Sequence, residues 1–320
     1  DFEKESELEI IGNYSFSSAS LKKIIIPKSV SEICEAAFMN CIELKSVTFE
    51  EGSKLVSINE SLFEYSSKLK TVTIPENSSL RSIHCNSFGN TGIKELFIPA
   101  SVEKIEDGWY ENSKYFVNVV VSPLNKNFKY LDDEHKIIVG KSDINQDIFD
   151  TIVFVSHDII HVKIPSAIKF IYQYSFGYCN NLQDVEFSED SELVSISNHL
   201  FYSSSIKSLF IPASLEEFED GWCNDVEKLS KVTISPSNKN FKYLDDEHQI
   251  IVGKSDKTKD TFDTIVFASR DIKCIKIPKH IKYIKKCAFE DCEKLKSVDF
   301  EKESELEIIG NYSFSSTSLK

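Results

Sequence analysis

An acidic tetrapeptide that ends in histidine occurs twice in the chain and is the feature most able to do chemistry. It reads Asp-Asp-Glu-His at Asp132–His135 and again at Asp245–His248. Carboxylates beside an imidazole can bind a metal ion or exchange protons with a substrate. Acidic residues are also typical of a solvated hairpin turn that keeps a sheet edge soluble. We favour the turn, and predict no catalytic, cofactor or metal site at either copy.

The eight cysteines are the second group of reactive side chains. Cys41, Cys179 and Cys292 occupy one position of a repeat described below, where other copies have Ser or Thr. That position therefore requires a small residue rather than a covalent bond. No paired Cys-x-x-Cys motif of a zinc site, phosphate-binding loop or nucleophile elbow occurs. We expect neither regular disulfides nor zinc, and we predict that the chain is not an enzyme.

Composition excludes two kinds of partner. A net charge of −14 over 320 residues cannot neutralise a nucleic-acid backbone or hold a chain on anionic lipid. No run is long and apolar enough for a spanning helix, and no signal peptide opens the chain. The sequence starts in mid-pattern without an initiator Met, so we expect a piece of a longer protein.

A repeat of about 23–25 residues organises the chain and positions these residues. One copy reads Leu21, Ile24, Ile26, Pro27, Val30, Ile33, Phe38, Cys41; another reads Ile272, Ile275, Ile277, Pro278, Ile281, Ile284, Phe289, Cys292. The apolar residues at positions four and six are two apart, so they share one face of a strand that the proline ends. Each rung leaves apolar surface above and below, which predicts a stack of parallel rungs. The Phe that recurs in this stack, as at Phe38 and Phe289, is expected to form a column in its core. The units start near Leu21, Leu44, Leu69, Ile93, Phe116, Ile159, Leu182, Ile206, Leu229, Ile272 and Leu295.

Two units, 116–158 and 229–271, have nearly double length. Both contain the sequence Asn-Lys-Asn-Phe-Lys-Tyr-Leu before the acidic tetrapeptide, so several short repeats together form one unit of a longer super-repeat. We interpret each long unit as two rungs with a hairpin-like excursion at the acidic turn. The segment 1–18 returns unchanged at 299–316, so the chain begins and ends at the same phase of its repeat.

The pattern of paired apolar residues, post-strand proline and Ala/Ser-Phe element resembles the BspA-like class of leucine-rich repeats. Ile26-Pro27 through Ala37-Phe38 and Cys41 is a close match, and the resemblance covers nearly the whole chain. Asp-Gly-Trp replaces the Phe element at Trp109 and Trp222, and three units lack the proline. The resemblance implies a single solenoid domain over residues 1–320. It would be a curved right-handed stack with a parallel sheet on its concave face and short strands or helical turns on the convex side.

The outward positions of the concave face are the predicted binding site. Position five of the repeat places Phe97 beside Val120, and Phe210 one super-repeat later. Exposed aromatic residues on a rigid face are hot-spot candidates, unless the adjacent long excursions cover them. Lys163, Glu186 and Lys276 occupy position five in other units. A lysine recurs at position two, at Lys22, Lys45, Lys70, Lys94, Lys207, Lys273 and Lys296. Such a basic stripe could attract acidic proteins or sulfated glycans, or merely deter aggregation at a sheet edge.

The family resemblance implies a surface-displayed adhesion protein that binds extracellular-matrix or host-cell proteins. The alternative is a cytoplasmic scaffold of the same fold, which the unpaired cysteines and the missing signal permit. Asn13, Asn59, Asn77 and Asn311 begin Asn-x-Ser triplets that can carry glycan on a secreted chain. Both ends lack polar caps, so end-to-end association between copies is also expected to be possible.

Overall fold

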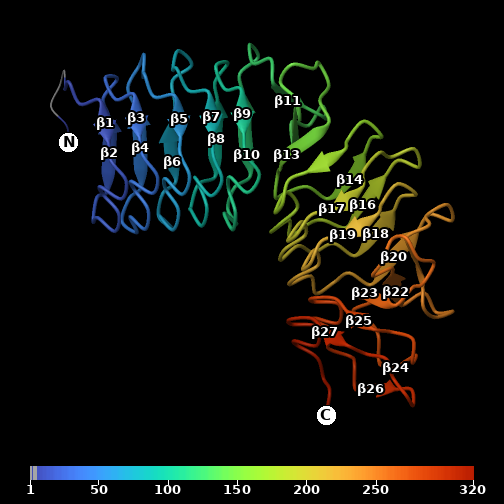
Figure 1. The fold of residues 1–320 in the computed structure, drawn as a ribbon. Coiled ribbons are helices and arrows are strands. Elements are labelled where there is room, and N and C mark those ends of the chain that lie inside the picture. The colour runs from blue at the N-terminus through green and yellow to red at the C-terminus, as the bar shows by residue number, and fades with distance from the viewer. Residues whose placement is uncertain (1, 3–5) are drawn as a thin grey trace. The chain divides into compact units, whose positions relative to one another are not determined.

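The computed structural model describes residue 2 and residues 6–320 and divides the chain into two compact units. The N-terminal unit comprises residues 1–157 and 172–175, and the C-terminal unit comprises residues 158–171 and 176–320. Residues 1 and 3–5, at the start of the duplicated segment, lie outside the described part. Figure 1 shows each unit as a succession of short strands joined by turns. The single domain over residues 1–320 stays a prediction.

Each rung of the N-terminal unit contributes one longer and one shorter strand. The longer strands are β2 (Lys23–Ile26), β4 (Ser46–Phe49), β6 (Thr71–Thr73), β8 (Glu95–Ile98) and β10 (Asn118–Val121). The shorter strands are β1 (Ile10–Ile11), β3 (Glu32–Ile33), β5 (Ser57–Ile58), β7 (Ser82–Ile83) and β9 (Lys104–Ile105). Neighbouring strands of each kind pair in parallel, as in β2–β4–β6 and β5–β7–β9. The predicted β-solenoid is therefore confirmed.

The C-terminal unit repeats this arrangement. Its longer strands are β14 (His161–Ile164), β16 (Asp184–Phe187), β18 (Ser208–Ile211), β20 (Lys231–Ile234), β24 (Cys274–Ile277) and β26 (Ser297–Phe300). Its shorter strands are β15 (Phe170–Ile171), β17 (Ser195–Ile196), β19 (Glu217–Phe218), β25 (Tyr283–Ile284) and β27 (Ile308–Ile309). The described residues contain no helix, so the return side of the rungs consists of very short strands and turns.

Strand parity places the apolar residues as predicted. In β2 the exposure alternates, with Lys23 and Ile25 outward and Ile24 and Ile26 buried. The proline that follows closes the rung, because the Pro27 carbonyl accepts a hydrogen bond from the Val30 amide at 3.1 Å. Burial of one such aliphatic side chain contributes about 1.5–3 kcal/mol, and stacking repeats it at every rung.

The Phe element forms a buried column of stacked rings. Phe38 lies 5.1 Å from Phe16 and 5.9 Å from Phe63 between ring centroids, and is fully buried. Where Asp-Gly-Trp replaces this element, the Trp109 ring continues the column 6.1 Å from Phe88. The predicted Phe column is therefore confirmed, and the tryptophans belong to it.

The cysteine position of the repeat is a buried hydrogen-bonding slot. The Cys41 thiol donates to the Phe16 carbonyl at 3.0 Å, and the Ser66 hydroxyl donates to the Phe38 carbonyl at 3.0 Å. A thiol and a hydroxyl therefore make the same contact one rung apart. Burial raises the pKa of the Cys41 thiol, which keeps it protonated as a donor. The requirement for a small side chain is confirmed.

The extra length of the two long units forms an antiparallel hairpin sheet. Its strands are β11 (Phe128–Tyr130), β12 (Ile137–Gly140) and β13 (Thr151–Val155) in the first unit, and β21 (Phe241–Tyr243), β22 (Ile250–Gly253) and β23 (Thr264–Ala268) in the second. The acidic tetrapeptides form the β11–β12 and β21–β22 turns, as predicted. Each long unit has a single long strand, β10 or β20. The added residues are thus an inserted hairpin and not a second complete rung.

Candidate functional site: the long-strand face

We define the long-strand face as the outward side of the longer strands. In the N-terminal unit its central row is uncharged and consists of Ile25, Thr48, Thr73, Phe97 and Val120. Phe97 and Val120 are direct neighbours in the β8–β10 register. Val120 is 36% exposed and Phe97 is half-buried, so the predicted aromatic remains accessible without being fully exposed. The row places an apolar pair at the end of a threonine-rich strip.

The same row of the C-terminal unit carries charge. Lys163 lies beside Glu186 in the β14–β16 register, and both are exposed. Phe210 is half-buried and lies beside Thr233 in the β18–β20 register, so it has no apolar partner like Val120. Lys276 lies beside Asp299 and forms a 3.7 Å ion pair with Glu301. Of the predicted residues at position five, the structure therefore brings together Phe97 with Val120, and Lys163 with Glu186.

The predicted lysine stripe is continuous only in the N-terminal unit. Lys22, Lys45, Lys70 and Lys94 stand at position two of four successive rungs, and all are exposed. The amide of Lys45 donates to the carbonyl of Lys22, and the amide of Lys70 donates to that of Lys45, at 2.8 and 3.0 Å. We call these four residues the lysine column. In the C-terminal unit Ile160, Gln183 and Ser230 interrupt the series, so Lys207 stands alone and Lys273 stacks only on Lys296.

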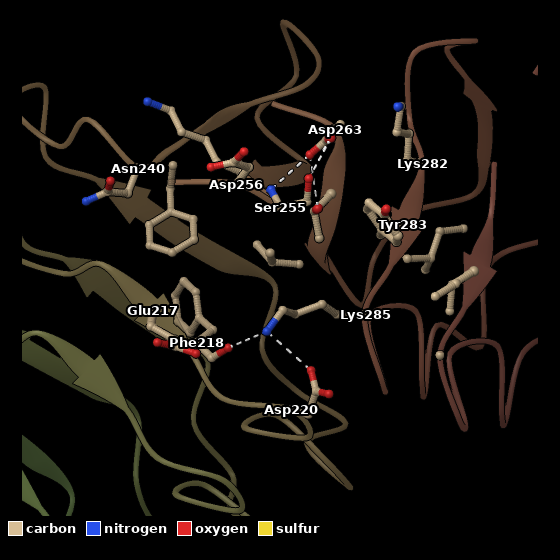
Figure 2. Close-up of a pocket in the computed structure, with 18 of the residues that line it drawn as sticks. Glu217, Phe218, Asp220, Asn240, Ser255, Asp256, Asp263, Lys282, Tyr283 and Lys285 are labelled. Atoms are coloured by element: carbon tan, nitrogen blue, oxygen red, sulfur yellow. Dashed lines mark hydrogen bonds and ion pairs between the residues drawn. The ribbon is translucent and has the colours of Figure 1, made fainter. Parts of the chain in front are cut away.

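A groove of about 940 Å³ lies in the C-terminal unit, where the inserted hairpin separates β19 from β25 (Figure 2). Lys285 spans it: its ammonium donates to the Phe218 carbonyl at 2.8 Å and pairs with Asp220 at 3.2 Å. In a regular rung that carbonyl would accept a backbone amide of the next short strand, as the Ile196 carbonyl accepts the Glu219 amide. The lysine thus replaces a missing rung contact.

The charges around this groove largely neutralise one another. Lys254 pairs with Asp260 at 3.0 Å, and Lys259 pairs with Asp256 at 3.0 Å. Neighbouring hydrogen bonds from Thr258 and Lys259 lower the pKa of Asp256 to about 2, so this carboxylate stays ionised. The groove therefore presents internal ion pairs rather than unsatisfied charge. The sequence did not reveal it, because its walls come from segments separated by the hairpin.

The acidic turns carry out a structural task that the sequence also did not reveal. The His135 backbone is left-handed at φ 59°, and its ring stacks on Tyr130 with centroids 4.1 Å apart. The Tyr130 hydroxyl donates to the Val119 carbonyl at 3.1 Å and accepts from the Val121 amide at 3.0 Å. Tyr243 makes the same two contacts on β20. Each tyrosine hydroxyl therefore provides a hydrogen-bond partner for one amide and one carbonyl at the edge of the long-strand sheet. No metal-binding cluster is found in residue 2 or residues 6–320.

Comparison with known proteins identifies the repeat. The BspA type leucine rich repeat region matches residues 1–117, 147–246 and 260–320, in six copies. The chain belongs to this family. Repeats of this family are generally non-catalytic. The unmatched segments contain β10, β11, β12 and β22, so they include part of each inserted hairpin and one rung strand.

Solved structures share the fold. A leucine-rich repeat protein from Eubacterium ventriosum is 17% identical, with a TM-score of 0.57, and the match covers 94% of this chain and 84% of that one. The pneumococcal vaccine antigen PcpA is 18% identical, with a TM-score of 0.58, covering 93% and 75%. No curated protein matches the sequence. Over the described residues, the structure has no helix that is long and apolar enough to cross a bilayer.

Proposed function

We propose that this chain is a surface-displayed adhesion module that binds host or matrix proteins through its long-strand face, and that it is not an enzyme. The observation that carries the proposal is the apolar pair Phe97 and Val120 on a rigid, hydrogen-bonded sheet. Accessible aromatic residues on a preformed surface are typical centres of protein recognition. Its likeness in fold to a protein named as a vaccine antigen agrees with surface display.

The rest of the face suits this role. The threonines of β4 and β6 extend the apolar pair into a neutral strip, and the charged row of the C-terminal unit supplies polar contacts around Phe210. Protein interfaces commonly combine an apolar centre with a polar rim. Each long-strand face is built on paired backbone groups, so binding would require little reordering of the chain.

Binding of the chain to immobilised extracellular-matrix and host-surface proteins tests the proposal. Phe97→Ala and Phe210→Ala should be measured singly and together, with Val194→Ala as control because Val194 is exposed on the short-strand side. If one phenylalanine contributes about 2 kcal/mol of binding free energy, its replacement by alanine weakens binding roughly thirtyfold. We expect Phe97→Ala to weaken binding more than Phe210→Ala. The proposal fails if no protein binds, or if the double variant binds as the control does at unchanged unfolding midpoint.

A further inference from the structure

The lysine column differs from many other basic residues of the chain in lacking partners. Lys68, Lys104, Lys254, Lys257, Lys259, Lys285 and Lys294 each form an ion pair. Among the described residues, no carboxylate lies within ion-pair distance of Lys22, Lys45, Lys70 or Lys94. Since the protein carries a net charge of −14, acidic residues are plentiful, yet none of the described carboxylates forms an ion pair with these four ammonium groups.

The surroundings of the column are also basic. Lys23 begins β2 beside Lys22, and Lys68 precedes Lys70. The nearby carboxylates are Glu43, which pairs with Lys68, and Glu95, which accepts a hydrogen bond from Asn118 at 2.7 Å. Hydrogen bonding to Lys68 and the fields of Lys68, Lys45 and Lys22 lower the pKa of Glu43. Both acids thus already have partners, and the local excess of positive charge remains.

The geometry of the column is linear and regular. Successive strands of a sheet are about 4.8 Å apart, so four rungs place the four lysines along a line of about 14 Å. The adjoining positions of β4 and β6 present the hydroxyl groups of Ser46 and Thr71, which directly follow Lys45 and Lys70. An evenly charged linear chain can meet every lysine at once, and a sugar chain can also exchange hydrogen bonds with the hydroxyls.

We propose that the lysine column and the neighbouring hydroxyl groups form a binding site for a linear sulfated polysaccharide. This site is separate from protein recognition through Phe97. A sulfated glycan fits better than an acidic peptide, because the amides and carbonyls of β4 already pair with β2 and β6. An extended peptide lying across β4 could therefore not form main-chain hydrogen bonds with that strand. A sugar chain brings its own hydroxyl donors and acceptors.

Binding of a heparin oligosaccharide to the whole chain tests this site, measured by calorimetry over a series of salt concentrations. Lys45→Gln/Lys70→Gln removes the two central charges of the column. Lys207→Gln/Lys296→Gln is the matched control, since it makes the same charge change at equivalent positions outside the column. We expect the column variant to bind roughly three- to tenfold more weakly and with a shallower salt dependence. The control should stay within about twofold.

Two further probes identify the occupant. A desulfated oligosaccharide of equal length should bind far more weakly than heparin, since it lacks the charges that the lysines would meet. Poly-glutamate should also bind more weakly than heparin. Equal loss in both lysine variants would show a diffuse charge effect and overturn the site. Equal or tighter binding of poly-glutamate would overturn the glycan in favour of an acidic protein, and absence of heparin binding at low salt would overturn the proposal outright. Phe97→Ala should leave heparin binding unchanged, which separates this test from that of protein recognition.

Discussion

Segments 93–157 and 206–270 have the same design one super-repeat apart, and two of their sequence differences bear directly on that design. Both have a Trp in the aromatic column, an inserted hairpin and a tyrosine that satisfies a strand edge. They differ in the outward row, where Phe97 faces Val120 but Phe210 faces Thr233. They also differ in one buried slot, which holds His157 in the first segment and Arg270 in the second. The design is thus kept although a buried slot and the outward row both differ, and only the outward row alters the surface of the long-strand face.

The buried slot shows how the fold accommodates a change of charge. Arg270 is 4% exposed and donates to the carbonyls of Val226, Ala268, Ala288 and Cys223 at 3.0–3.2 Å. In the first segment His157 lies near the ring of Tyr110, with centroids 6.4 Å apart. Cys223 stands where the first segment has Tyr110. The larger arginine is therefore matched by a smaller neighbour, which conserves the volume of the core.

The largest expected effect comes from breaking this slot. Arg270→Met leaves four buried carbonyls without their donor, and we expect a loss of about 3–5 kcal/mol in unfolding free energy. Arg270→His/Cys223→Tyr installs the residues of the first segment and should recover a large part of that loss. Denaturant unfolding followed by circular dichroism measures both. If the single and double variants are equally destabilised, the two slots are not equivalent.

The edge tyrosines should behave alike in the two segments. Tyr130→Phe and Tyr243→Phe each remove a hydroxyl that serves one carbonyl and one amide of a strand edge. We expect each to cost about 1–2 kcal/mol, because the two backbone groups lose their partner. Local hydrogen exchange at Val121 and Ile234 measures the effect directly. A loss at only one of the two positions would show that the hairpins have different roles.

The sequence was sufficient to predict the rung, the strand parity and the Phe column, because each depends on local apolar spacing. Ile24 and Ile26 had to share a face whatever lay next to them. It was insufficient for Arg270 and Lys285, whose partners come from other rungs and from the hairpin. The interpretation of the long units as two rungs was wrong because β12 and β13 are as apolar as rung strands, and apolar content does not distinguish a hairpin from a rung. Phe97 was found by parity, but its half-burial depends on packing.

The smallest expected effect concerns a turn position that three rungs of the N-terminal unit occupy with asparagine. Asn40, Asn90 and Asn112 adopt a left-handed backbone there, and Asp291 does so at φ 57° in the C-terminal unit. Burial, together with the charge of Glu290, raises the pKa of Asp291 to about 6, and its Oδ2 atom has no hydrogen-bond partner in the described residues. The ionised carboxylate is therefore less stable in the folded than in the unfolded chain.

Asp291→Asn should therefore stabilise the protein above pH 6. An acid whose pKa is raised on folding destabilises the folded state when ionised, and that penalty disappears as the pH falls through about 6 toward 3.8. We expect a gain of about 1 kcal/mol at pH 7.5, less than the full shift implies because the carboxylate is still partly solvated. The gain should vanish near pH 4. Unfolding midpoints at both pH values measure it, with Asp271→Asn as an exposed control. A gain that persists unchanged at pH 4 would mean that asparagine helps only through its left-handed backbone preference, and that the buried carboxylate carries no penalty.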